Sequence, residues 1–242
     1  MRFGRTIVEG NMQRAIQTTL SIEQRGKSDG FTLIEMIGVL AVMTVLVALL
    51  LPRVFEIMAE SKANALVAAV KTYETAVVDY YADIGSLLPL DVSGVPAVEN
   101  SGNSNNSRSL PARLTLDQSD PLNTGNNSWV KFKGPYLAKF SSTTPPGLGT
   151  TVRMPARTPE AYGTATTGSN RAWDLNDDAN SDIPASANVV YVSFSDITLQ
   201  DFERVDSILD KGFGGTATER QLRGRVKYDI TTKEMLIYLM HG

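Results

Sequence analysis

The chain has 242 residues, 42% of them hydrophobic and 20% charged, with a formal net charge of −3. It contains no cysteine, which excludes disulfides, thiolate metal sites and cysteine nucleophiles. Residues 31–242 carry 18 basic and 23 acidic side chains, and such an acidic body lacks the clustered Lys and Arg that nucleic acid requires, so no nucleic-acid partner is expected.

Residues 1–30 form a leader that is rich in basic side chains. It carries three acidic and five basic residues, the basic ones being Arg2, Arg5, Arg14, Arg25 and Lys27. Basic residues ahead of an apolar run predict a leader in the cytoplasm and residues 53–242 on the other side of the membrane. Met1 and Met12 are both candidate start sites, and translation from Met12 would give a shorter leader.

Residues 31–51 read FTLIEMIGVLAVMTVLVALLL, an apolar run with a single charge. As a helix this run is about 31 Å long, which matches the hydrocarbon core of a bilayer. It is longer than the apolar part of a secretory signal peptide, and no small-residue cleavage pattern follows it. The sequence therefore predicts a retained transmembrane helix over 31–52, and Pro52 should kink the helix or start a new segment.

Glu35 is the one charge inside this run. A carboxylate in an apolar span is unfavourable and indicates a functional residue, although a position at the cytoplasmic interface is the simpler alternative. The surrounding sequence, Lys27-Ser28-Asp29-Gly30-Phe31-Thr32-Leu33-Ile34-Glu35, resembles the type III signal of type IV pilins and pseudopilins. The resemblance implies that a membrane aspartyl peptidase, the prepilin peptidase, cuts between Gly30 and Phe31 and methylates the new amino terminus of Phe31. It also implies that Glu35, fifth in the mature chain, pairs with the terminal amine of a neighbouring subunit.

The same resemblance implies the partners and the place of the protein. Membrane lipid surrounds the helix before assembly, the prepilin peptidase processes the chain in the inner membrane, and an inner-membrane assembly platform builds a homo-oligomeric filament with minor pilins or pseudopilins. The head is then periplasmic. No G-x-S-x-G, phosphate-binding or dinucleotide motif is present, and an enzyme is not expected.

Residues 53–84 are predicted to continue the helix with one apolar face half-buried on the head. The face is formed by residues at spacings of three, four or seven, and Gly85 is a plausible stop. They are Val54, Ile57, Met58, Ala65, Ala69, Tyr73, Val77 and Tyr80.

Residues 91–128 are rich in Gly, Pro, Ser, Thr and Asn and are predicted to form a polar surface loop. The run Gly134-Pro135-Tyr136-Leu137 that follows resembles a segment of the major pseudopilin of type II secretion. A plain turn with a packed Tyr136 explains these four residues nearly as well.

Residues 174–182 read DLNDDANSD and alternate oxygen-bearing side chains in the manner of a Ca²⁺ loop. The candidate ligands are Asp174, Asn176, Asp178, Asn180 and Asp182. Ala179 and Ala185 depart from the EF-hand pattern, so a bare acidic loop is the alternative. Major pseudopilins carry a calcium site in this half of the head, and Ca²⁺ is the only cofactor expected.

The last quarter of the chain contains the clearest strands. Residues 189–194 and the pair 225–230 and 235–240 are rich in β-branched and aromatic residues, and residues 198–210 indicate a helix. Antiparallel strands packed on the outer half of the long helix predict an α+β head over 85–242. His241, the only histidine, is expected to be frayed at the end of the chain.

Two other functions stay open. Within the pilin-like family, the Gly134–Leu137 run and the lack of cysteines favour a type II secretion pseudopilin, whereas the polar loop and the length of the chain favour a type IV pilin for adhesion, motility or DNA uptake. A bitopic sensor or adaptor would use residues 31–51 as a plain anchor and would retain residues 1–30.

Overall fold

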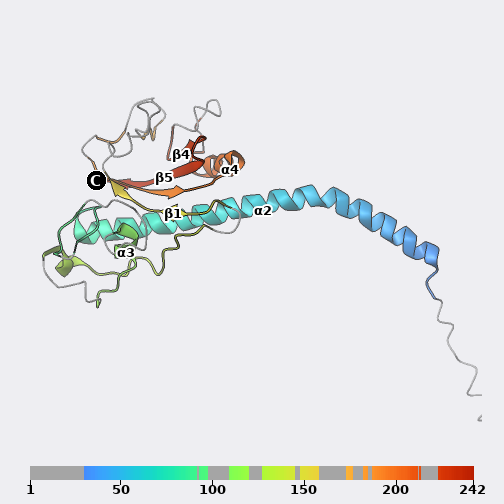
Figure 1. Ribbon diagram of the computed structural model, residues 1–242, viewed down its shortest axis with the longest axis horizontal. Coiled ribbons are helices and arrows are strands. Elements are labelled where there is room, and N and C mark those ends of the chain that lie inside the picture. The colour runs from blue at the N-terminus through green and yellow to red at the C-terminus, as the bar shows by residue number, and fades with distance from the viewer. Residues whose placement is uncertain are drawn as a thin grey trace, which may run out of the picture. The chain divides into compact units, whose positions relative to one another are not determined.

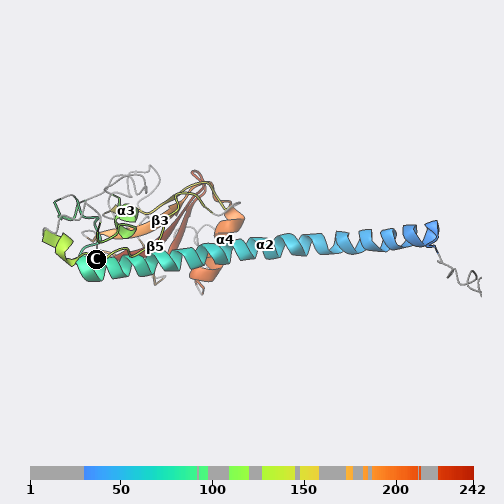
Figure 2. The same ribbon diagram turned by 90° about the horizontal axis from the view of Figure 1, so that it is seen from below.

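The computed structural model describes residues 30–91, 93–97, 109–119, 127–144, 148–157, 173–176, 182–184, 187–211, 213 and 223–242. The chain divides into two compact units, Met1–Arg53 and Val54–Gly242, and helix α2 (Leu33–Ile84) contributes to both. In the second unit an antiparallel sheet packs on the C-terminal half of α2 (Figures 1 and 2). The predicted α+β, pilin-like class is confirmed.

The half of α2 that belongs to the first unit buries none of its side chains. Every described residue from 30 to 53 is exposed, although the helix is apolar on all sides. Among the described residues, α2 is the one helix long and apolar enough to cross a membrane, with a mean hydropathy of 2.6 in its best window. A helix of this composition requires lipid or other subunits around it.

The helix runs through Pro52 without a break, which confirms the predicted continuation over 53–84 and leaves a kink as the remaining alternative for this proline. The kink stays a prediction. Thr44, one of the few polar residues in the apolar half, donates its hydroxyl proton to the carbonyl oxygens of Leu40 and Ala41 at 2.9 and 2.8 Å. This local bond satisfies the hydroxyl inside an apolar segment.

The half of α2 in the second unit buries a stripe that begins later than predicted. Val54, Ile57 and Met58 are 48, 62 and 51% exposed, so their predicted burial on the head is wrong. The sheet and loops cover the helix from Ala63 onward. The buried residues of α2 are Ala63, Leu66, Val67, Val70, Ala76, Val77, Tyr80 and Ile84, of which Val77 and Tyr80 were predicted.

The helix ends where the sequence places its stop. Gly85 follows Ile84 with φ of +75°, a left-handed conformation that favours glycine, and its N–H donates to the carbonyl of Tyr81 at 2.8 Å.

The sheet has five strands, all paired antiparallel. Its order is β1-β3-β5-β4, with β2 also pairing with β3, and α4 (Leu199–Leu209) connects β3 to β4. The predicted strand at 189–194, the helix at 198–210 and the C-terminal hairpin are all present. The strands are β1 (Val152–Arg153), β2 (Ala156–Arg157), β3 (Val189–Phe194), β4 (Val226–Asp229) and β5 (Glu234–His241).

Both faces of the sheet are covered. One face, with Val192 and Ile237, packs with α2 in the main core. The other face carries Tyr191 and Tyr238, which pack with Trp173 in a second, smaller core. The loop that contains the candidate calcium ligands therefore also supplies the cover for the second face.

Two further expectations are wrong. Residues 110–114, inside the predicted polar loop, form the short helix α3 (Leu110–Leu114) and are largely buried. Apolar Leu110 and Leu114 drive this burial, and the buried Arg113 donates from Nε to the carbonyl of Leu90 at 2.6 Å. His241 is not frayed, because it is the last residue of β5 and its Nδ1 lies 2.6 Å from the hydroxyl of Tyr238.

Candidate functional site at the start of the long helix

The predicted cleavage site lies in a short non-helical segment just before α2. Gly30, Phe31 and Thr32 have no regular structure, and the first helical hydrogen bond runs from the N–H of Met36 to the carbonyl of Thr32 at 3.2 Å. Phe31 is 77% exposed, and a methyl group in place of the Gly30 hydrogen would meet no atom within 4 Å. The peptide bond between the two residues is therefore accessible within the described part of the chain.

Thr32 and Glu35 form a reciprocal capping box at the helix start. The Thr32 hydroxyl oxygen accepts from the N–H of Glu35 at 3.3 Å. In return, Oε2 of Glu35 accepts from the N–H and from the hydroxyl of Thr32, both at 2.8 Å. Two backbone donors that a helix start otherwise leaves unpaired are satisfied in this way.

Among the residues that the structure describes, none supplies a counter-charge to the Glu35 carboxylate. Both of its bonds to Thr32 use Oε2, and no Lys or Arg among the described residues forms an ion pair with it. The carboxylate is held by the N–H and the hydroxyl of Thr32, and Oε1 takes part in neither of these bonds.

Thr32 is the residue of this site that sequence reasoning missed. The signal was present, because Thr32-Leu33-Ile34-Glu35 has the Thr-x-x-Glu spacing of a capping box directly before an apolar helix.

The candidate calcium loop is described in part. Asp174 is buried, and its carbonyl accepts from the N–H of Gly224 at 2.7 Å. Asp182 closes the loop: its Oδ2 accepts from the N–H groups of Leu175 and Asn176 at 2.6 and 3.1 Å, and its Oδ1 accepts from the Asn176 amide at 2.9 Å.

The donor chemistry of this loop fits calcium, because carboxylates and an amide oxygen are the hard ligands that this ion takes. The side-chain NH₂ group of Asn176 donates to Asp182, so the Asn176 amide would have to rotate before its oxygen could bind an ion. Asp178 and Asn180 lie outside the described residues. Over the described residues, no group of three or more His, Cys, Asp and Glu is placed to hold a metal.

The Gly134–Leu137 run is a structural anchor in the head. The N–H groups of Tyr136 and Leu137 both donate to the carbonyl of Leu114 at 2.9 Å. The Tyr136 hydroxyl donates to Oδ2 of Asp83, near the end of α2, at 2.9 Å, while Lys133 pairs with Oδ1 of the same carboxylate at 2.6 Å. Burial is the largest cause that raises the pKa of Tyr136, to about 12, and the hydrogen bond to Asp83 acts in the same direction.

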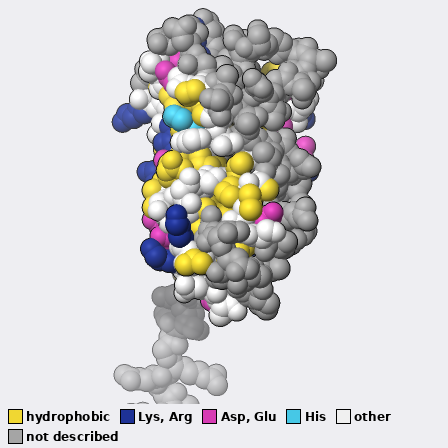
Figure 3. Space-filling view, turned by 90° about the vertical axis from the view of Figure 1, so that its left-hand side faces the viewer, with side chains coloured by type: hydrophobic (Ala, Val, Ile, Leu, Met, Phe, Trp, Pro, Cys, Tyr) yellow, Lys and Arg dark blue, Asp and Glu magenta, His cyan; other side chains and the backbone are white. Residues whose placement is uncertain are grey.

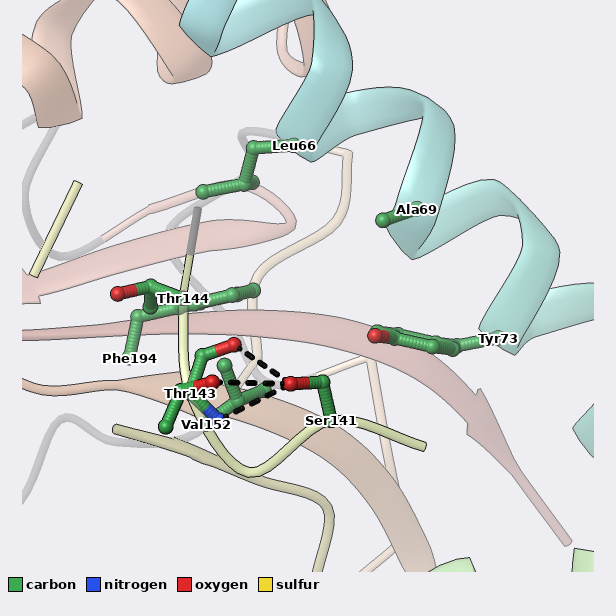
Figure 4. Close-up of a pocket in the computed structure, with 8 residues that line it drawn as sticks. All are labelled: Leu66, Ala69, Tyr73, Ser141, Thr143, Thr144, Val152 and Phe194. Carbon is green, nitrogen blue, oxygen red and sulfur yellow. Dashed lines mark hydrogen bonds between the residues drawn. The ribbon is translucent and has the colours of Figure 1, made fainter. Parts of the chain in front are cut away.

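A pocket of about 310 Å³ lies between α2 and the sheet (Figure 4). Its wall includes the apolar side chains of Leu66, from α2, and Phe194, from β3, and its polar lining includes the hydroxyls of Ser141, Thr143 and Tyr73. Ser141 and Thr143 bond to each other at 3.0 Å. Among the described residues that line it there is no carboxylate, histidine or lysine, and Tyr73 is the one titratable group.

The surface in Figure 3 is chemically mixed over the described residues. Apolar side chains lie between cationic and anionic ones, and both signs of charge appear at the margins. No basic patch forms on the described part of this face.

Residues 25–51 match the model of the prokaryotic N-terminal methylation motif. No curated protein and no solved structure matches the chain. The match covers the non-helical segment, the capping box and the apolar half of α2. It marks structural pilin-type proteins, which are not enzymes, and together with the apolar helix it fits a protein that crosses the inner membrane once.

Proposed function

We propose that this prepilin-type protein, of the type IV pilin and pseudopilin family, is a structural subunit of a type II secretion pseudopilus. One observation supports a filament subunit: residues 25–51 match the methylation motif, and the described residues leave the apolar half of α2 exposed. Prepilin peptidase would cut between Gly30 and Phe31 and methylate Phe31. The subunit would then leave the lipid bilayer through the assembly platform and join a homo-oligomeric filament with minor pseudopilins.

The chemistry of assembly follows from the charge at Glu35. Cleavage creates an α-amine at Phe31, a cation with a reference pKa of about 7.7–8.0. A buried cation and a buried carboxylate are each unfavourable alone, and they neutralise one another when they meet in a medium of low dielectric constant. The amine of a new subunit can meet the Glu35 carboxylate of an older subunit only when the two helices are staggered, so this pair would set the register of the filament.

The test separates charge from helix capping. Glu35→Gln keeps a residue that completes a capping box and removes the charge. We expect the variant to insert and to be cut after Gly30, while the amount of filament falls at least tenfold when it is the sole copy. Glu60→Gln, on the exposed surface of the same helix, is the matched control and should assemble like the wild type.

Filaments are measured by shearing or overproduction, imaging and blotting against the membrane fraction, and the N-terminus by intact mass. Wild-type assembly by Glu35→Gln would refute the register mechanism. A wild-type chain that retains residues 1–30 would instead support the membrane-anchored sensor or adaptor.

A type IV pilin for adhesion, motility or DNA uptake is the second candidate. The Gly134–Leu137 run favours the pseudopilin, since it resembles a major pseudopilin segment. The two are separated by deleting the gene and measuring secretion of exported enzymes on one hand and twitching and surface attachment on the other. Loss of secretion alone supports the pseudopilin.

We also propose that residues 174–182 bind Ca²⁺. Asp174, Asn176 and Asp182, with Asp178 and Asn180, would supply oxygen ligands, and the ion would hold the loop that covers the second face of the sheet.

A further inference from the structure

The capping box begins the helix two residues after the bond that we propose is cleaved. The first helical hydrogen bond reaches only to the carbonyl of Thr32. The carbonyl of Gly30, which is the one that a peptidase attacks, therefore lies outside the helical pattern. Gly30 and Phe31 are both non-helical.

Without a stop, the helix would enclose this bond. If helical hydrogen bonds continued upstream, the N–H of Ile34 would donate to the carbonyl of Gly30, four residues earlier. A peptidase must bind both sides of the bond in an extended form and reach the carbonyl carbon, so a helical Gly30 would have to unwind first. In an apolar medium, unpaired N–H groups find no water, which favours extension of the helix.

The capping box removes this tendency. It pairs the N–H of Thr32 with Glu35 and the N–H of Glu35 with the Thr32 hydroxyl, so two donors at the helix start are satisfied without another turn. The Glu35 bond also depends on the helix start, because the carboxylate reaches back to Thr32, whose hydroxyl caps the N–H of Glu35.

We propose that Thr32 is a positioning residue for cleavage, whose hydroxyl stops the helix and keeps the Gly30–Phe31 bond extended for the peptidase. This inference rests on the proposed function, in which that bond is the one cut.

The experiment uses the full-length precursor in detergent with purified prepilin peptidase, and initial rates at several substrate concentrations. Thr32→Val keeps the β-branched shape and removes the capping oxygen. A cap worth about 1 kcal/mol corresponds to about a fivefold change in the extended population. The apparent KM should rise by up to about that factor. The value of kcat should stay unchanged, because the bound substrate is already extended.

Two rescue variants separate capping from direct recognition of the hydroxyl. Thr32→Ser and Thr32→Asn both supply a good cap, and both should restore the wild-type KM. The proposal is overturned if Thr32→Val is cut with the wild-type KM, or if Thr32→Asn is as poor as Thr32→Val while Thr32→Ser is normal. Backbone chemical shifts at Phe31 and Thr32 should become helical in Thr32→Val alone. A wild-type chain that is not cut after Gly30 would overturn the proposed function, and this is seen before any variant is made.

Discussion

Val70 and Val78 offer a matched test of which face of α2 holds the head together. Both lie in the half of the helix that belongs to the second unit, eight residues apart. Val70 is 0% exposed within the main core, whereas Val78 is 45% exposed. The same substitution, Val→Ala, therefore removes core packing at one position and mainly surface contact at the other.

The magnitude follows from the two carbons removed. Each buried methyl or methylene contributes about 0.8 kcal/mol, and the cavity that remains adds a further cost, so Val70→Ala should lose about 2–3 kcal/mol. Val78→Ala should lose less than about 1 kcal/mol. Alanine is the better helix former, but this gain is the same at both positions and cancels in the difference.

The assay is thermal unfolding of a soluble fragment from residue 54 to 242, followed by circular dichroism. A domain of 150–250 residues loses about 2–4 °C for each kcal/mol, so Val70→Ala should melt about 4–12 °C below the wild type. Val78→Ala should stay within about 4 °C of it. Equal shifts for the two variants would refute the assignment of the Val70 face to the core.

Three further outcomes are expected from the same fragment. Calcium at a hundred times its dissociation constant should stabilise the fold by about 2.7 kcal/mol, so chelation should lower the melting temperature. Asp174→Ala should abolish this response. If the wild type does not respond, residues 174–182 are a plain acidic loop. Gly134→Ala should cost about 1–3 kcal/mol, because the added carbon would lie 2.6 Å from the carbonyl oxygen of Leu116, and an unchanged urea midpoint would contradict this. Burial raises the pKa of Asp210 above its ordinary 3.8. This effect outweighs the hydrogen bond that the N–H of Val226 donates to the Asp210 carboxylate at 2.8 Å, which lowers the pKa. The folded state therefore holds the proton more tightly, and wild-type stability relative to Asp210→Asn should fall as the pH rises from below 3.8 through the raised pKa; a flat difference over that range contradicts the assignment.

Local patterns predicted the elements of the head well. The hairpin, the strand at 189–194 and the stop at Gly85 each depend on a few neighbouring residues, whose turn chemistry and β-branched content act within the segment itself. The Thr-x-x-Glu spacing was equally local. It was missed because Glu35 had been interpreted only through a neighbouring subunit.

The phase of the buried stripe could not be predicted in the same way. Apolar residues at helical spacing occur on more than one side of residues 54–80, and the one-sided burial depends on where the sheet and loops lie. Because these cover the helix only from Ala63 onward, Val54 and Ile57 stay exposed despite their apolar character. Likewise, α3 lies in a segment whose polar composition outweighs the two leucines that bury it.

Four apolar side chains, Val54, Phe55, Ile57 and Met58, are exposed at the start of the second unit and favour contact with other subunits during assembly. These side chains lie just beyond Pro52 and are 48, 64, 62 and 51% exposed. A surface of this kind is costly in water, so it favours a partner that supplies an apolar covering. Exposed apolar side chains thus extend along the helix from residue 33 to residue 58, interrupted near the end by Arg53 and Glu56, while Glu35 is the single carboxylate of the run 31–51. Apolar packing along such a helix is tolerant of sliding, because one turn of aliphatic side chains resembles the next. A charge pair at Glu35 is not tolerant of sliding, since a displacement of one turn, about 5.4 Å, separates the charges. The apolar length would therefore supply the cohesion of the proposed filament and Glu35 its register, which is why charge removal should reduce assembly without reducing insertion.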